Sequence, residues 1–273
     1  MFRFDEIHPY VHVYKGMMKN TEYSHKILKS SAESNKKNSY FGEWTDWFVF
    51  GKYTNMERHD AIINEVLDDE KIQEMRVYEE IVDVTHSAMG HYAGFYKIDL
   101  PESAFYTNPS LAYYYENVSV ANWGNGRTMD YHTDFVLPEW YWPGEKFLIT
   151  CTNYINDDYE GGEIEFLIDD KIIPYKPEAG DVLVFPSGSP LFPGKVPYYH
   201  GVRDITKGTK YLVRTYIKYI SEATSEWIEG EKQYGEKEWP LIAQQKARRT
   251  TSVSIDEETG IIRYPDYDYL FDK

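Results

Sequence analysis

The chain has 273 residues, enough for one large domain or two small ones. Its formal charge is 29 − 45 = −16, so it repels phosphate backbones and anionic lipid, which argues against a nucleic-acid or membrane partner. Cys151 is the only cysteine, which excludes an internal disulfide and a thiolate zinc cluster.

The N-terminal third is predicted to be mainly helical. The alternating stretch "HPYVHVYKG" (8–16) predicts a short strand, and residues 17–34 show helical spacing of apolar side chains. The clearest helical block is 54–92, with Thr54 or Asn55 as a candidate N-cap. The first residues lack the apolar run of a signal peptide, and no window reaches the roughly 18 apolar residues of a membrane span. We therefore expect a cytoplasmic protein.

From about residue 111 the sequence reads as strands. Eight strand-like segments are separated by Gly, Pro, Asn and Asp clusters, and the high aromatic content of 17% suits half-buried strands. This pattern predicts a barrel or sandwich. The segments are 111–123, 127–135, 146–155, 162–168, 171–177, 181–186, 198–205 and 210–220.

The chain becomes polar and acidic after Ile220 and is predicted to be helical again near 239–249. We interpret 221–273 as an extension that packs on the core through its Trp and Tyr side chains.

A candidate metal site begins at His132 and Asp134, which lie two residues apart in an extended run. Alternate side chains of a strand share one face, so the imidazole and the carboxylate should project together. Such a pair alone is more often a surface pair than a metal site. His200 lies on a late strand of the same block and completes two histidines and one carboxylate, a facial triad suited to Fe(II).

The strand after His200 offers cations for an acidic co-substrate. Lys210, Leu212 and Arg214 alternate and should share one face, and Tyr154 could add a hydroxyl donor. A buried carboxylate paired with Lys or Arg gains roughly 1.5–3 kcal/mol, so a 2-oxo acid with a second carboxylate fits this pattern. Lys210 could equally be a solvated edge lysine, and Tyr154 a core tyrosine.

Four segments in order resemble the 2-oxoglutarate- and Fe(II)-dependent dioxygenase superfamily, and within it the prolyl 4-hydroxylase-like branch. The resemblance covers about 111–220. It rests on "GNGRTMDYHTD" (124–134), "LITCTNYINDDYEGGEIEF" (148–166), "PYKPEAGDVLVFPS" (174–187) and "YHGVRDITKGTKYLVRTYI" (199–217).

The resemblance implies a role for each matching residue. His132, Asp134 and His200 would bind iron, and Lys210, ten residues after His200, would grip the far carboxylate of 2-oxoglutarate. Tyr154 would assist, and Arg214 could share or take over the role of Lys210. The implied cofactors are Fe(II), 2-oxoglutarate and O2, with ascorbate as a further candidate.

Two departures from the branch's pattern stand out. The tyrosine that many relatives carry about ten residues before the first metal histidine is missing near Asn122 and Trp123, and Tyr113 to Tyr115 lie further back. Tyr216 stands where the pattern usually ends in Trp. The aromatic run 135–147 could be core packing or a lid over the substrate.

The expected fold is a double-stranded β-helix, or jelly roll, mainly β with flanking helices. We expect a dioxygenase domain at 1–220, with helical support at 1–95, a β-helix core at about 111–220 and the extension at 221–273.

The expected function is hydroxylation of a C–H bond, of a peptidyl residue such as proline, with decarboxylation of 2-oxoglutarate to succinate. The partner is then a peptide or small-molecule substrate, and no oligomeric state is predicted. Alternatives are an oxygenase acting on a small metabolite or nucleobase, a non-catalytic cupin-like binding protein, and a zinc hydrolase using the same triad.

Overall fold

The structure is a computed structural model. It describes residues 3–34, 45–46, 69–107, 109–116, 127–134, 143–188, 198–243, 254–255 and 262–263. The candidate N-caps at residues 54 and 55 and the expected helix over 54–68 lie outside this described part.

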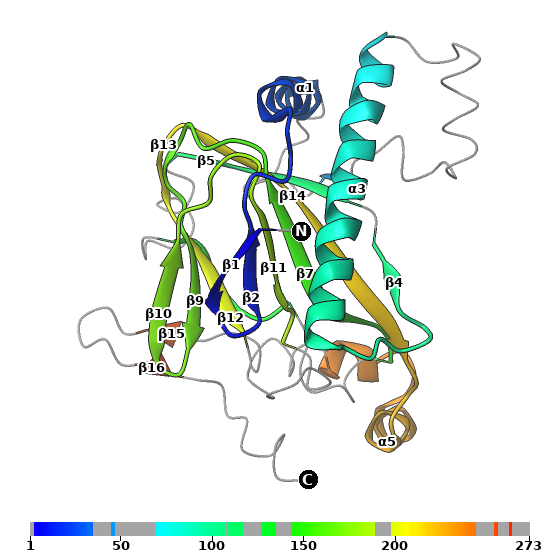
Figure 1. Cartoon of the computed structure of the whole chain (residues 1–273). Helices are drawn as coiled ribbons and strands as arrows, with labels where there is room; N and C mark the ends of the chain where they lie inside the picture. Colours follow the sequence, from blue (N-terminus) through cyan, green and yellow to red (C-terminus); the bar gives the residue numbers. More distant parts are fainter. Residues whose placement is uncertain are drawn as a thin grey trace.

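The larger sheet has eight strands in the order β1-β2-β11-β7-β14-β5-β3, with β4 paired to β14 (Figure 1). Its neighbouring strands are antiparallel, and the long pair β7 and β14 forms its centre. The bounds are β1 Phe4–His8, β2 Val11–Tyr14, β3 Thr45–Asp46, β4 Phe105–Tyr106, β5 Ser110–Tyr115, β7 Gly144–Tyr154, β11 Val182–Pro186 and β14 Thr209–Ser221. The strand expected within 8–16 is therefore confirmed as β2.

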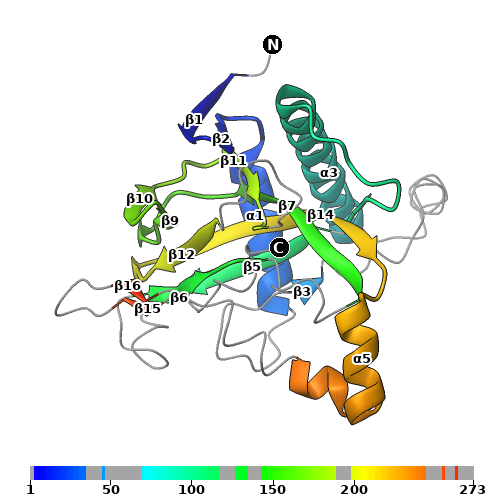
Figure 2. The ribbon, with the colours of Figure 1, turned by 90° about the horizontal axis from the view of Figure 1, so that it is seen from below.

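The smaller sheet has four strands in the order β10-β9-β12-β6, and Figure 2 shows β12 and β6 side by side. A further short pair joins β13 to β8. The bounds are β6 Arg127–His132, β8 Glu160–Gly161, β9 Ile164–Ile168, β10 Lys171–Tyr175, β12 Tyr199–Arg203 and β13 Ile205–Lys207.

An aromatic and aliphatic core fills the space between the two sheets. Phe166 of the smaller sheet meets Phe185 of the larger one edge to face, with ring centroids 5.0 Å apart. Both rings are almost fully buried and belong to one apolar cluster that also holds Leu183 and Ile164. Apolar side chains at alternate positions of facing strands make such a core, so the expected mainly β fold is confirmed.

Two helices cover the outer face of the larger sheet. Helix α3 (Asp69–Tyr96) contacts β7 and β11, and α1 (Thr21–Ser34) packs on α3 and β14 (Figure 1). Met89 and Tyr92 of α3 are fully buried against Tyr14 and Cys151 of the sheet. The sequence-based expectation of N-terminal helical support is confirmed in this region. No helix in the described ranges combines the length and apolar character needed to cross a bilayer.

The C-terminal region contains a helix that the sequence analysis did not identify, α5 (Ser225–Tyr234). Thr224 caps it by accepting a hydrogen bond from the backbone N–H of Trp227 at 3.3 Å. Trp227 and Trp239 then pack edge to face with centroids 5.8 Å apart. The helix was missed because its apolar contacts come from two tryptophans in an otherwise acidic stretch. Of the helix expected at 239–249, residues 239–243 are described and helical.

Strand β15 (Ser254–Ile255) pairs antiparallel with β16 (Ile262–Arg263). Ile255 and Ile262 pack against the cluster that contains Tyr131, Leu167 and Tyr199. The division of the chain at residue 220 stays a prediction.

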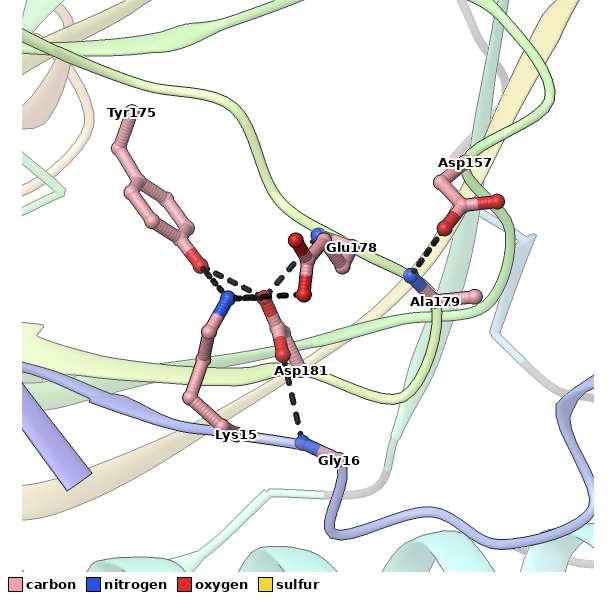
Figure 3. A network of polar contacts seen from close by, with 7 residues as sticks. All are labelled: Lys15, Gly16, Asp157, Tyr175, Glu178, Ala179 and Asp181. Carbon is pink, nitrogen blue, oxygen red and sulfur yellow. Dashed lines mark hydrogen bonds and ion pairs between the residues drawn. The ribbon is translucent and has the colours of Figure 1, made fainter. Parts of the chain in front are cut away.

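A polar network ties β2, β10 and β11 together (Figure 3). The Lys15 ammonium lies 2.9 Å from the buried carboxylate of Asp181 and donates to Tyr175 and Glu178. Asp181 also accepts from the Tyr175 hydroxyl at 2.6 Å and from the Gly16 N–H at 3.3 Å. A buried carboxylate is tolerated here because several donors satisfy it.

Candidate active site

His132, Asp134 and His200 come together in one cluster. Each offers a donor atom, and the three atoms lie within 4.8 Å of one another. His132 Nε2 is 3.8 Å from Asp134 Oδ1, and His200 Nε2 is 3.7 Å from Asp134 Oδ2. The expected juxtaposition of a late histidine with the early pair is therefore present.

Strand pairing brings the two imidazoles together. His200 of β12 is the direct register partner of His132 of β6, and their ring centroids are 4.5 Å apart. Side chains that face each other across an antiparallel pair are held about 5 Å apart. The β12 pairing is irregular just after His200, and such bulges often lie beside functional sites.

Asp134 reaches the cluster differently from the expectation. Strand β6 ends at His132, and Asp134 lies in a bend two residues later, so the pair does not sit on one continuous strand. The carboxylate is held by the hydroxyl of Thr150, which donates to Oδ2 at 2.7 Å and also bonds Ser187. The sequence analysis missed Thr150, because a threonine inside a strand has no motif that marks it as a support for a ligand.

The protonation states of this cluster suit a divalent metal. Burial raises the pKa of the Asp134 carboxyl, but His200, Arg214 and His132 together bring it below its usual value. Burial lowers the pKa of His200 to about 4, against the opposing attraction of Asp134. At neutral pH the site thus offers a carboxylate and a neutral His200 imidazole, which are the forms that bind metal.

His200 is also oriented by its other ring nitrogen. Its Nδ1 lies 3.1 Å from the carbonyl oxygen of Tyr198, and because a carbonyl only accepts, this nitrogen carries the proton. Nε2 is left as the lone-pair donor toward Asp134. This arrangement is the usual support for a metal-binding histidine. The residues present therefore fit a metal ion on chemical grounds.

A pocket between the two sheets lies beside the cluster. It encloses about 360 Å³, counting the solvent at its opening, and its walls come from both sheets. The apolar lining includes Met129, Ile164, Phe185 and Leu212. The polar lining consists of Tyr114, Thr150, Thr152, Tyr154, His200, Lys210 and Arg214.

Lys210 places a fully buried cationic group in this pocket. Its Nζ donates to the carbonyl of Gly162 at 2.7 Å and lies 5.0 Å from the centre of the Tyr154 ring. Among the residues that the structure describes, no carboxylate lies within ion-pair distance of this nitrogen. Burial, with the nearby charge of Lys176, lowers the pKa of Lys210 to about 7. An incoming carboxylate would supply the missing counter-charge.

The glycine pair beside Lys210 is required by close packing. Gly161 and Gly162 have φ of +74° and +69°, a region that favours glycine. A Cβ on Gly161 would lie 2.1 Å from the Asp204 carbonyl oxygen, and one on Gly162 would lie 2.3 Å from Ile205 Cδ1. The backbone can therefore present the Gly162 carbonyl to Lys210 only without side chains here.

Tyr154 lies at the end of β7 with its side chain buried in the pocket wall. Its backbone N–H bonds the carbonyl of Asp181 at 2.9 Å, and its own carbonyl accepts from Gly180 at 2.8 Å. Burial holds the pKa of its hydroxyl well above the usual value, with a further contribution from Tyr159. The hydroxyl therefore keeps its proton and is available as a donor.

Arg214 shares the pocket with Lys210, which confirms that the two face the same side of β14. Its guanidinium pairs with Asp134, whose Oδ1 lies 3.5 Å from Nη1. The two cations thus serve different parts of the pocket.

Tyr114 supplies an aromatic wall that the sequence analysis left unassigned. It lines the pocket and is the register partner of Lys210 across β5 and β14. Burial raises the pKa of its hydroxyl to about 12, partly offset by Arg214. The alternation of side chains over 111–115 predicts that some of these rings face inward. Because three tyrosines follow one another, the sequence does not show which rings they are. Residues 135–142 of the candidate lid lie outside the described part.

The two facing sheets form a double-stranded β-helix, and two histidines with one carboxylate beside an inner pocket are a ligand set that suits Fe(II). A family model described as the 2OG-Fe(II) oxygenase superfamily matches residues 118–218. This match spans the β-rich block that contains His132, Asp134 and His200.

Solved structures share the fold. A truncated form of the viral collagen prolyl hydroxylase from Paramecium bursaria Chlorella virus-1 is 15% identical, with a TM-score of 0.51 over 78% of this chain and 90% of that one. The same enzyme in complex with 2OG is 16% identical, with a TM-score of 0.52 over 78% and 97%. A search of curated proteins finds no significant match.

Proposed function

We propose that the chain hydroxylates a peptidyl residue such as proline, coupled to the oxidative decarboxylation of 2-oxoglutarate to succinate and CO2. The observation that carries the proposal is the buried Lys210, which lines one pocket together with His200 of the His-Asp-His cluster. A buried cation that pairs with no carboxylate of the described residues costs stability, so its place beside His200 favours an acidic co-substrate.

The proposed division of roles follows the geometry. His132, Asp134 and His200 would hold Fe(II), which, with O2 and the 2-oxo acid, supplies the oxidising chemistry when bound. Lys210 would bind the far carboxylate of 2-oxoglutarate, with the Tyr154 hydroxyl as a second donor. The apolar walls of Met129, Ile164 and Phe185 would keep bulk water from this region.

The proposed substrate class rests on two arguments. One solved structure of similar fold is that of a viral collagen prolyl hydroxylase, which supports a peptidyl proline for this chain. The net charge of −16 weakens attraction to nucleic acid and so disfavours a nucleobase in a polynucleotide. A basic or neutral proline-containing peptide agrees better with this surface charge than an acidic one.

The test is succinate release from 2-oxoglutarate by the full chain, with Fe(II), ascorbate and a panel of proline-containing peptides. We expect iron-dependent succinate formation that one class of peptide stimulates, and a 16 Da mass increase in that peptide. His132→Ala should abolish both signals, and Lys218→Met should leave them unchanged, since Lys218 pairs with Glu145. Succinate formed equally well without iron would overturn the proposed mechanism.

A further inference from the structure

Two basic residues of one strand line the pocket at different positions along that strand. Lys210 and Arg214 lie four residues apart on β14, which places their backbones roughly 13 Å apart along the strand. The Lys210 ammonium contacts the Gly162 carbonyl, whereas the Arg214 guanidinium lies 3.5 Å from Asp134 Oδ1. Arg214 therefore lies against a carboxylate that would hold a metal ion.

The guanidinium is held in this position from two sides. Its central carbon lies 4.9 Å from the centre of the Tyr216 ring, and its partner Asp134 is fixed in turn by Thr150. The Arg214 side chain is only 17% exposed. A stacked and paired guanidinium loses little further freedom when it binds another planar anion.

The positive charge of Arg214 opposes a divalent ion at Asp134, and an anion bound beside it would offset that repulsion. A fixed positive charge beside the metal-binding carboxylate repels a divalent ion that uses the same oxygens. Lys210 lies away from Asp134. It also carries a positive charge, like Arg214, so it cannot offset this repulsion. An anion that arrives with the metal, next to Asp134, would turn the repulsion into attraction.

A 2-oxo acid brings such an anion. The carboxylate next to its keto group is the end that would lie beside the metal, and it is planar, so a guanidinium can bind it with two parallel hydrogen bonds. The carboxylate at the other end would lie beside Lys210.

We propose that Arg214 binds the metal-side carboxylate of the 2-oxo acid while Lys210 binds the far carboxylate, so that one strand grips the co-substrate at both ends. This inference rests on the proposed function. It differs from an assignment of both cations to the far carboxylate, and from a purely structural pairing of Arg214 with Asp134.

The experiment compares two ligands that differ in one carboxylate. The full chain is loaded with Mn(II), and the binding of 2-oxoglutarate and of 2-oxopentanoate, which lacks the far carboxylate, is measured by calorimetry. The wild type should bind 2-oxoglutarate more tightly. Lys210→Met should remove most of this preference, because it removes the partner of the far carboxylate.

Arg214→Met should instead weaken both ligands by a similar factor, about tenfold or more, and keep the preference for 2-oxoglutarate. The affinities of Arg214→Lys should lie between those of the wild type and Arg214→Met, because lysine keeps the charge but lacks the planar guanidinium. Arg214→Lys also replaces Arg214→Met in the test if Arg214→Met does not fold. Lys218→Met, on the same strand but paired with Glu145, is the matched control and should bind both ligands as the wild type does. Mn(II) affinity, measured without ligand, should rise in Arg214→Met.

The outcomes separate the two proposals. If the wild type binds neither acid, the proposed function fails and this inference fails with it. If the wild type binds both but Arg214→Met changes neither affinity by more than twofold, the inference alone is overturned. The inference would also be overturned if Arg214→Met bound 2-oxoglutarate more weakly but 2-oxopentanoate as tightly as the wild type does, because Arg214 would then bind the far carboxylate.

Discussion

The Lys210 ammonium donates to the backbone carbonyl of Gly162 at 2.7 Å, so the buried cation is aimed by main chain and not by a carboxylate. The carbonyl belongs to a glycine whose φ is +69° and whose missing side chain leaves room for Ile205. The orientation of Lys210, the proposed anchor, therefore depends on Gly162, which has no side chain.

Gly162→Ala should damage both stability and co-substrate binding. The added Cβ would approach Ile205 Cδ1 to 2.3 Å in a strained backbone conformation, for a combined cost of about 3 kcal/mol. Urea unfolding and 2-oxoglutarate titration measure the two effects. Gly235→Ala is the control, because Gly235 also has positive φ but nothing lies within 4 Å of its Cβ position. Equal losses of affinity in both variants would contradict the role of Gly162.

Binding of 2-oxoglutarate should take up a proton at pH 8. Burial lowers the pKa of Lys210 to about 7, so at pH 8 most molecules carry a neutral amine there. A carboxylate beside it raises this pKa and draws a proton in, so affinity should fall as pH rises above 7. Calorimetry in two buffers of different ionisation enthalpy measures the uptake. Lys210→Met should show none, and equal uptake in that variant would contradict the assignment.

The lowered pKa of Lys210 should also make the free energy of unfolding depend on pH when no ligand is bound. The folded pKa of Lys210 lies below the unfolded value of roughly 10.4. The unfolded chain thus binds more protons between pH 7 and 10, and this group makes the folded state more stable as pH rises through that window. The stability advantage of Lys210→Met over the wild type should shrink from pH 7 to pH 10, as measured by urea unfolding. A constant difference would contradict the lowered pKa.

Thr150→Val should weaken metal binding more than it weakens folding. The change keeps the side-chain shape but removes the hydroxyl that donates to Asp134 at 2.7 Å. Loss of such supporting contacts typically lowers metal affinity by about 10-fold or more. Mn(II) titration measures it. Thr152→Val, two residues further along β7 in the same pocket, is the control. The idea fails if both variants bind Mn(II) equally well.

Lys15→Met should destabilise the fold by about 2 kcal/mol, because it removes a charged donor from the buried Asp181. The network of Figure 3 holds the end of β2 against β11, next to the backbone of Tyr154. Thermal or urea unfolding measures the change. Lys207→Met removes an exposed pair with Glu160 and should have no measurable effect. Comparable losses in the two variants would show that the network gives no special stability.

Much of the fold was predictable because its strands alternate and are bounded by turn residues. The long strand β14 and the buried strand β11 lie where the apolar runs place them. The site residues His132, Asp134 and His200 were predictable from residue type and order. Their mutual geometry was not, because it depends on which strands pair and in which register.

Other features had no readable signal. Helix α5 depends on contact between Trp227 and Trp239, which a search for periodic apolar residues does not detect. Arg214 was expected to point the same way as Lys210, which it does, but its pairing with Asp134 depends on the bend after β6. Asp134 lies in that bend, beyond the end of β6. Its side chain is therefore brought to His132 by the tertiary fold and not by the alternation of side chains along one strand.

The pairing of His132 with His200 has a consequence for how this site tolerates change. Because the imidazoles are opposite each other in the ladder of β6 and β12, their spacing does not depend on the length of chain that joins them. Insertions in the connecting segment can therefore change its length without moving either ring. A slip of one residue between the two strands, by contrast, would turn one ring to the opposite face of the sheet and remove the site in a single step.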